Sequence, residues 1–224
     1  MNSTRPGLAN LRITVDTVIL TIVDESLKVL LVKRDSPPFE GQLVLPGGYM
    51  WDGETSTETA ERVLRDKTKV SGVFVEQLYT FDSLDRDPRE RVISIAYFAL
   101  VPAKSMANLP SSVSLLDVYD IGDLGFDHLE MVKMAVDRTK SKLEYTNAAY
   151  SLLPKRFTLS ELQAIYETIL NQKLDKRNFR KKILSLGMIK ETNEMQTGKK
   201  HRPARLYSFR KQTKQSFDSP FVWL

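Results

Sequence analysis

The sequence predicts an α+β protein of two parts, with a strand-rich unit over residues 1–140 and a helical, basic unit over residues 141–224. Three observations indicate this division. Runs of β-branched residues fill the first part, helical apolar repeats begin the second, and the net charge changes sign between them. A chain of 224 residues with 42% hydrophobic content suits one large or two modest globular domains.

The first unit reads as a series of β-strands separated by polar connections. Runs rich in β-branched and aromatic residues cover residues 13–23, 27–34, 74–81, 92–101 and 114–120. Asp24, Glu25 and Ser26 form a turn signal between the first two runs, which predicts a β-hairpin.

Two helices are predicted in the same unit. The first covers residues 56–67, and the second begins at Phe126-Asp127-His128 with Asp127 as its N-cap. Residues 138–145 contain neither Pro nor Gly, so we expect them to form a stiff connection between the two units.

The charge of the chain is unevenly distributed. Residues 141–224 hold 17 Lys and Arg against 7 Asp and Glu, a net charge of +10, which leaves −5 for residues 1–140. A basic unit behind a mildly acidic one indicates a polyanionic partner for the basic unit. The alternative is a lysine-rich surface with no nucleic-acid partner.

Other composition features bound the location and the chemistry. The chain has no Cys, which excludes disulfides and thiol chemistry. Its N-terminus lacks the apolar core of a signal peptide, and no stretch approaches the ~18 apolar residues of a membrane span. We therefore expect a cytoplasmic protein with no membrane partner.

The stretch from Leu45 to Val70 carries glycine, glutamate and arginine at a fixed spacing. Five residues separate Gly48 from Glu54, and seven separate Glu54 from Arg62. This frame resembles the Nudix box, the loop–helix–loop in which Nudix hydrolases hold a metal ion and split nucleoside diphosphate derivatives. The resemblance implies a Nudix-like α/β/α sandwich with a mixed sheet for residues 1–140.

The box of this chain departs from the catalytic pattern at the metal-binding positions. Nudix enzymes carry Glu at three helix positions where this chain has Val63, Asp66 and Lys67. Mg²⁺ needs oxygen ligands, whereas Val63 offers none and Lys67 brings a positive charge. We therefore predict no catalytic residues, no metal site and no cofactor. Gly47 and Gly48 would still allow close approach of a ligand to the backbone, and Glu54 and Arg62 can pair to brace the loop.

Further residues are candidates for binding a nucleotide-like ligand. Guanidinium groups match phosphate oxygens, so three arginines in the loop of residues 82–92 could clamp a diphosphate. Their alternative is internal pairing with Asp85, Asp87 and Glu90. Arg34 could meet a phosphate or be a solvated strand end, and His128 could be a ligand contact or a structural histidine. The predicted ligand set outside the box is Arg34, Phe81, Arg86, Arg89, Arg91 and His128.

The second unit has the pattern of a helix-turn-helix followed by two strands. Thr158 and Glu161 form a capping box for one helix, and Asp175 caps a second that Gly187 ends. We expect Phe179, Ile183, Leu184 and Leu186 to face inward. The outer face of the second helix would contact bases through Arg177, Asn178 and Lys181, and phosphates through Arg180 and Lys182, with Lys176 beside them.

Two strands are expected at residues 188–190 and 204–209, joined by a basic turn. Such a turn after a recognition helix is a wing that contacts the DNA backbone or minor groove. The predicted wing contacts are Lys199, Lys200, His201 and Arg202.

A degenerate Nudix box followed by a basic winged helix resembles the Nudix-related transcriptional regulators of the NrtR family. Segments that carry the resemblance include LPGGY, RDPRERVISIAYFAL, FDH, LPKRFTLSELQAIYETIL, DKRNFRKKIL and RPARLYSF. It implies a homodimeric repressor of NAD-biosynthesis genes, whose Nudix domain binds ADP-ribose as an effector and so weakens binding to a double-stranded DNA operator. Lys69 stands where the box usually has Gly. Three alternatives remain: a Nudix hydrolase of ADP-ribose or a related compound, a regulator that senses a sugar, and an RNA-binding regulator.

Overall fold

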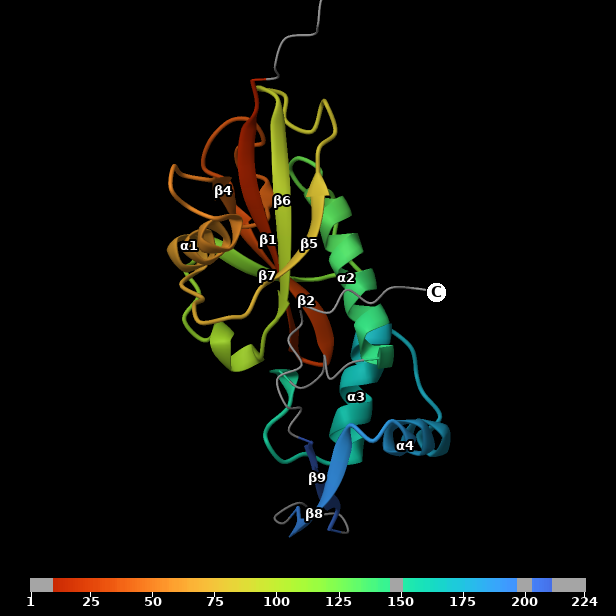
Figure 1. Cartoon of the computed structure of the whole chain (residues 1–224). Helices are drawn as coiled ribbons and strands as arrows, with labels where there is room; N and C mark the ends of the chain where they lie inside the picture. The colour runs from red at the N-terminus through yellow and green to blue at the C-terminus, as the bar shows by residue number, and fades with distance from the viewer. Residues whose placement is uncertain (1–9, 146–150, 197–202, 211–224) are drawn as a thin grey trace, which may run out of the picture.

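A computed structural model describes residues 10–145, 151–196 and 203–210. It confirms the predicted α+β class, with a mixed β-sheet between two helices and a small helical unit below it (Figure 1). The chain runs in the order β1 (Arg12–Val23), β2 (Ser26–Lys33), β3 (Leu43–Val44), β4 (Gly47–Tyr49), α1 (Ser56–Thr68), β5 (Glu76–Phe81), β6 (Val92–Leu100), a short 3₁₀ turn (Ala103–Met106), β7 (Val113–Asp117), α2 (His128–Tyr145), α3 (Leu159–Leu170), α4 (Lys176–Ser185), β8 (Ile189–Met195) and β9 (Arg205–Phe209).

The main sheet is mixed because β1 and β6 run parallel while its other pairs are antiparallel. Its strands follow the order β3-β2-β1-β6-β5, with β4 also paired to β1 and β7 to β2. The first half of β1 pairs with β4 and the second half with β2. The glycine-containing strand of the box is thereby placed directly beside the centre of the sheet.

Both faces of the sheet are covered, so its central strands are apolar on both sides. Along β1, Val18 and Leu20 join the core under α2, whereas Val15 and Ile19 join the core under α1. The alternation follows the two-residue period of a strand. It explains why residues 13–23 read as a nearly continuous apolar run.

Helix α2 differs from the prediction at both ends. Asp127 does precede its first residue, but the carboxylate of Asp127 accepts hydrogen bonds from the Arg86 side chain. Residues 138–145, predicted as a separate connection, form the last turns of α2. The helix itself is therefore the stiff connection.

The C-terminal unit packs against the Nudix-like unit, and the two share a hydrophobic core. One hydrophobic cluster contains Leu78 and Val132 of the first unit together with Leu162 and Ile183 of the second. The hydroxyl of Tyr166 on α3 donates a hydrogen bond of 3.0 Å to the carbonyl oxygen of Leu143 on α2. Tyr119 reaches α3 in the same way, by donating to the carbonyl oxygen of Ile169.

The predicted helix-turn-helix caps are confirmed. Thr158 and Glu161 form both hydrogen bonds of a capping box, and the Asp175 carboxylate accepts from the backbone N–H of Asn178. Gly187 has a positive φ of 65°, which suits glycine at the end of α4. β8 and β9 pair as predicted, but β8 extends to Met195, so residues 191–195, predicted as part of the turn, belong to the strand. Over the residues that the structure describes, no helix combines the length and apolarity of a membrane span.

Candidate functional site

The Nudix-box loop is braced by the predicted pair of Glu54 and Arg62. Arg62 donates from Nε to Glu54 Oε1 at 2.6 Å and from Nη2 to Glu54 Oε2 at 2.8 Å. Its guanidinium also lies 3.6 Å from the ring centroid of Trp51 and donates to the carbonyl oxygen of Tyr49. The hydrogen bond from Arg62 lowers the pKa of Glu54 to about 2, so Glu54 remains ionised. These contacts hold the loop against α1.

The two glycines of the box are explained by contacts within the chain. Gly47 pairs with Asp16 across β4 and β1, and a Cβ on Gly47 would lie 1.7 Å from Asp16 Oδ1. A Cβ on Gly48 would lie 3.1 Å from the Val63 side chain. Close approach of the backbone to the Asp16 and Val63 side chains therefore favours glycine at both positions, and their predicted role in the approach of a ligand stays a prediction.

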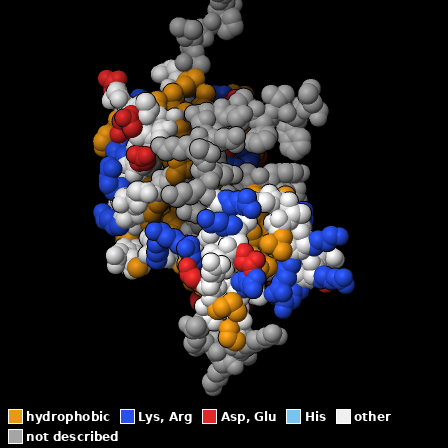
Figure 2. Space-filling model, turned by 60° about the horizontal axis from the view of Figure 1, so that its bottom comes forward, with side chains coloured by type: hydrophobic (Ala, Val, Ile, Leu, Met, Phe, Trp, Pro, Cys, Tyr) orange, Lys and Arg blue, Asp and Glu red, His pale blue; other side chains and the backbone are white. Residues whose placement is uncertain are grey.

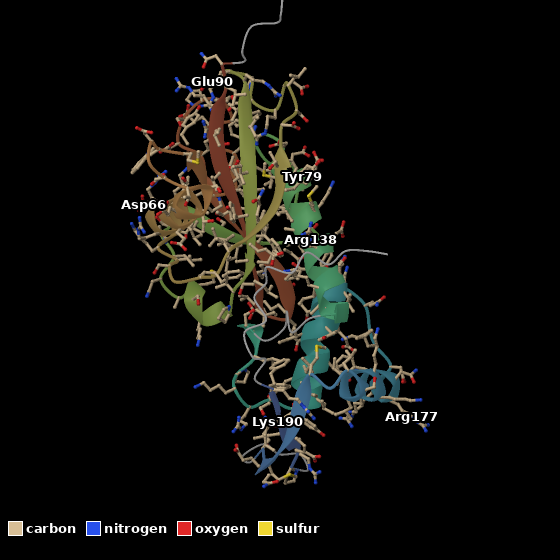
Figure 3. The ribbon with its side chains drawn as sticks, viewed as in Figure 1. Asp66, Tyr79, Glu90, Arg138, Arg177 and Lys190 are labelled. Carbon is tan, nitrogen blue, oxygen red and sulfur yellow. The ribbon has the colours of Figure 1, made fainter. Side chains whose placement is uncertain are left out.

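The metal-binding positions of the box do not fit a divalent cation. Val63 is buried against Gly48, and Asp66 is exposed on α1 and forms an ion pair with Arg65 (Figure 3). Within residues 10–145, 151–196 and 203–210, no group of three or more His, Cys, Asp or Glu side chains could hold a metal ion. The carboxylates needed to bind Mg²⁺ are therefore not assembled in the described part of the chain.

A buried carboxylate, Asp16, organises the region between the box and α2. Ser94 donates to Asp16 Oδ2 at 2.6 Å, Arg86 Nη2 lies 3.8 Å from the same oxygen, and His128 Nε2 lies 3.6 Å from Oδ1. Asp16 is only 6% exposed. Asp16 was not predictable from the sequence, because one acidic residue in an apolar strand carries no local signal.

His128 has a structural position at the start of α2. Its Nδ1 accepts a hydrogen bond of 2.9 Å from the backbone N–H of Leu45, so Nε2 carries the ring proton that faces Asp16. Burial lowers the pKa of His128 and favours the neutral ring. Phe81, Arg86 and His128 are each less than a tenth exposed, so in this structure their side chains offer little surface for direct ligand contact.

The loop arginines pair mainly within the protein. Arg86 donates two hydrogen bonds to Asp127, and Arg89 binds the carboxylate of Asp87 through Nε and Nη2. Arg91 donates to the backbone carbonyl oxygens of residues 82 and 83. Of the predicted internal partners, Asp87 forms such a pair, whereas Glu90 binds Arg12 and Tyr49.

An aromatic pair flanked by arginines lies beside this cluster. The rings of Phe39 and Phe126 meet edge to face with centroids 4.7 Å apart, and both residues have positive φ angles, 64° and 60°. The guanidinium carbons of Arg34 and Arg89 lie 5.1 and 5.9 Å from the Phe126 centroid. Backbone strain of this kind in bulky residues is typical of binding sites. Neither phenylalanine is among the residues that the sequence predicts to bind a ligand.

The recognition helix presents most of its predicted DNA contacts to solvent. Lys176, Arg177, Asn178, Lys181 and Lys182 are exposed. Arg177 points away from the rest of the molecule at the outer end of α4 in Figure 3, and Lys and Arg side chains gather on the face shown in Figure 2. This arrangement suits contact with a polyanion.

Two predicted features of α4 need correction. Arg180 is half-buried, and its Nε is buried without a hydrogen bond to the described residues. Leu184 and Leu186, predicted to face inward, are 49% and 40% exposed, so Phe179 and Ile183 alone anchor the helix core. The predicted wing residues Lys199, Lys200, His201 and Arg202 lie outside the described residues.

Comparisons with known proteins match both units. Residues 13–135 match the NUDIX domain family, and residues 149–209 match the family described as the NrtR DNA-binding winged helix domain. An ADPR responsive transcriptional repressor NtrR from Acinetobacter baylyi is 34% identical over 204 residues, covering 88% of this chain and 81% of the relative. The chain belongs to the NrtR family.

Solved NrtR structures extend this relationship to both units. Shewanella oneidensis NrtR, crystallised with a 27mer DNA, is 33% identical with a TM-score of 0.76, covering 88% of this chain and 93% of that one. The NUDIX domain of the same NrtR, crystallised with ADP ribose, is 34% identical with a TM-score of 0.53, covering 58% of this chain and 90% of that one. An ADP-ribose pyrophosphatase from Methanocaldococcus jannaschii is also 32% identical over 114 residues, 50% of this chain and 68% of the enzyme.

Proposed function

We propose that this NrtR-family chain is a homodimeric repressor that binds an operator through α4 and is released when ADP-ribose binds its Nudix unit. The proposal rests on one observation: the exposed basic face of α4 belongs to the same chain as a Nudix fold whose described residues form no metal-binding carboxylate set. The relatives crystallised with DNA and with ADP ribose support the two halves of the proposal separately. Genes of NAD biosynthesis are the proposed targets, and the cytoplasm is the proposed location.

The proposed effector site lies around Phe39, Phe126, Arg34 and Arg89. Aromatic faces can stack with an adenine ring, and guanidinium groups can bind diphosphate oxygens. Arg89 pairs with Asp87, but its side chain is still 39% exposed, so part of the guanidinium group remains accessible to a ligand. Gly47, Gly48, Glu54 and Arg62 support this site by fixing the box loop.

The proposed link between the two sites is α2. Its first residue, His128, is buried beside Asp16, and near its other end Leu143 packs in the core under α3. A cavity of about 360 Å³ is lined mainly by residues of α3, α4 and the turn between them, among them Tyr166, Phe179 and Ile183, and Leu143 of α2 also lines it. A shift of α2 on effector binding could therefore move α4 and change the spacing of recognition helices in a dimer. Coupling of about 1–3 kcal/mol would change operator affinity by roughly 5- to 150-fold.

We also propose that the Nudix unit does not hydrolyse its ligand. The rival function is hydrolysis of ADP-ribose, which the similarity to the pyrophosphatase from M. jannaschii supports. Incubation with ADP-ribose and Mg²⁺, followed by measurement of AMP and ribose 5-phosphate, separates the two. Turnover at ordinary enzyme rates of about 1 s⁻¹ or more would establish the rival.

Fluorescence anisotropy with a duplex from the chain's own upstream region tests the repressor function. Salt is held constant, because phosphate contacts make affinity steeply salt-dependent. We expect sequence-preferring binding that ADP-ribose weakens at least fivefold. If operator binding were unchanged by ADP-ribose but weakened by a sugar, the effector would be a sugar. If the protein bound an RNA probe more tightly than the duplex, its nucleic-acid partner would be RNA.

A further inference from the structure

Lys67 occupies the box position at which Nudix enzymes have a metal-binding glutamate. It lies one helical turn after Val63, which packs against Gly48 of β4, so the two residues share the side of α1 that faces the box strand. Lys67 retains an exposed side chain. Its ammonium group is nevertheless close enough to Asp16, Arg34 and Asp35 for their charges to act on its pKa.

The ammonium of Lys67 has no fixed partner in the described part of the chain. None of the hydrogen bonds or ion pairs among the described residues includes its Nζ, whereas Lys69 on the next turn donates to a backbone carbonyl oxygen. Desolvation lowers the pKa of Lys67; of the neighbouring charges, Asp16 and Asp35 raise this pKa and Arg34 lowers it. A desolvated cation that has no hydrogen-bonded partner among the described residues is a poor arrangement for the free protein, and a bound polyanion would supply that partner.

Arg34 connects this position to the proposed effector site. Its guanidinium donates to the backbone carbonyl oxygens of Pro37 and Pro38 and lies beside the Phe126 ring. Ammonium and guanidinium groups donate hydrogen bonds to phosphate oxygens, and their positive charge can neutralise the phosphates as Mg²⁺ does in Nudix enzymes. We infer that Lys67 and Arg34 bind the diphosphate of the nucleotide effector directly and that effector binding needs no divalent cation.

Calorimetric titration of the full-length protein with ADP-ribose, in EDTA and in Mg²⁺, tests this inference, which rests on the proposed function. We expect equal affinity in the two buffers. Lys67→Met should weaken binding at least tenfold, and Lys67→Arg should retain most of it. Lys67→Glu restores a box carboxylate, so its weak binding in EDTA should improve when Mg²⁺ is added.

Lys104→Met is the matched control, because Lys104 is an exposed lysine of the same unit on the 3₁₀ turn after β6. It should bind ADP-ribose like the wild type. Wild-type binding that requires Mg²⁺, or unchanged binding by Lys67→Met, would overturn the inference while leaving the repressor function intact. Operator binding without ADP-ribose binding in either buffer would instead overturn the proposed effector, and the inference with it.

Discussion

Arg86 binds Asp127 through two hydrogen bonds of 2.9 and 2.8 Å, and thereby ties the β5–β6 loop to the residue that directly precedes α2. The same guanidinium lies 3.8 Å from the buried carboxylate of Asp16. One cation therefore connects the central strand, the arginine loop and the helix that leads to the DNA-binding unit. Any ligand that rearranges this loop would act on the start of α2.

Replacement of Arg86 should strongly destabilise the fold. Arg86→Met leaves two carboxylates without their cation, one of them on a residue only 6% exposed, and such a loss costs about 3–5 kcal/mol. Urea unfolding followed by circular dichroism measures the change. The exposed pair of Arg12 and Glu90 provides the control, since Arg12→Met should cost less than about 1 kcal/mol. Equal losses in the two variants would contradict the structural role of Arg86.

His128 should make the stability of the protein depend on pH. Burial holds the folded-state pKa of His128 below its ordinary value of 6.5, so the unfolded chain binds the proton more readily. The stabilisation is fully present above pH 6.5 and is lost as pH falls below it, at up to about 1.4 kcal/mol per pH unit. Urea unfolding at pH 7.5, 6.5 and 5.5 measures this slope. His128→Gln should flatten it, whereas His201→Gln, which changes the only other histidine, should keep the wild-type slope.

Gly47 should tolerate no side chain. The Cβ of Gly47→Ala would overlap Asp16 Oδ1, and displacement of that buried carboxylate would also disturb Ser94, Arg86 and His128. We expect a loss of at least about 3 kcal/mol in the free energy of unfolding, at the upper end for overpacked sites. Gly122→Ala is the control, because a Cβ there meets no atom within 4 Å. A stable Gly47→Ala variant would show that Asp16 can move without cost.

The contrast between predicted and missed residues has a physical basis. The capping box of Thr158 and Glu161, the turn at Gly187 and the pair of Glu54 with Arg62 were predictable because their partners lie within eight residues of one another. The cluster around Asp16 was not, because its partners Arg86, Ser94 and His128 come from a loop, a strand and a helix about 70 to 112 residues away. The positive φ angles of Phe39 and Phe126 have no sequence signature either, since phenylalanine does not favour that region. The arginine loop allowed two interpretations, and only the fold could show that its cations pair internally.

Substitutions in the recognition helix α4 should distinguish residues that contact bases from residues that contact phosphates. Arg177→Ala should cost about 1–3 kcal/mol of operator affinity and relax preference at one base position, whereas Lys182→Ala should weaken operator and random duplexes equally. Lys182→Ala should also reduce the slope of log K against log salt by about one. Anisotropy titrations at several salt concentrations measure both effects. Lys133→Ala, which changes an exposed lysine of α2, is the control. If Arg177→Ala weakened binding to operator and random duplexes equally, Arg177 would contact the DNA phosphate backbone and not a base.

The contact between Tyr166 and Leu143 should carry part of the coupling between effector and DNA. Burial raises the pKa of Tyr166 to about 12, so its hydroxyl remains a neutral donor to the carbonyl oxygen of Leu143 on α2. Tyr166→Phe removes this hydrogen bond at a cost of about 1 kcal/mol but keeps the ring that packs against Phe179 of α4. Operator affinity should change little, whereas the loss of affinity caused by ADP-ribose should shrink, because α2 then holds α3 less firmly. Anisotropy with and without ADP-ribose measures this ratio. Tyr79→Phe, on an exposed tyrosine of β5, is the matched control, and an unchanged ratio in Tyr166→Phe would place the coupling outside the α2–α3 contact.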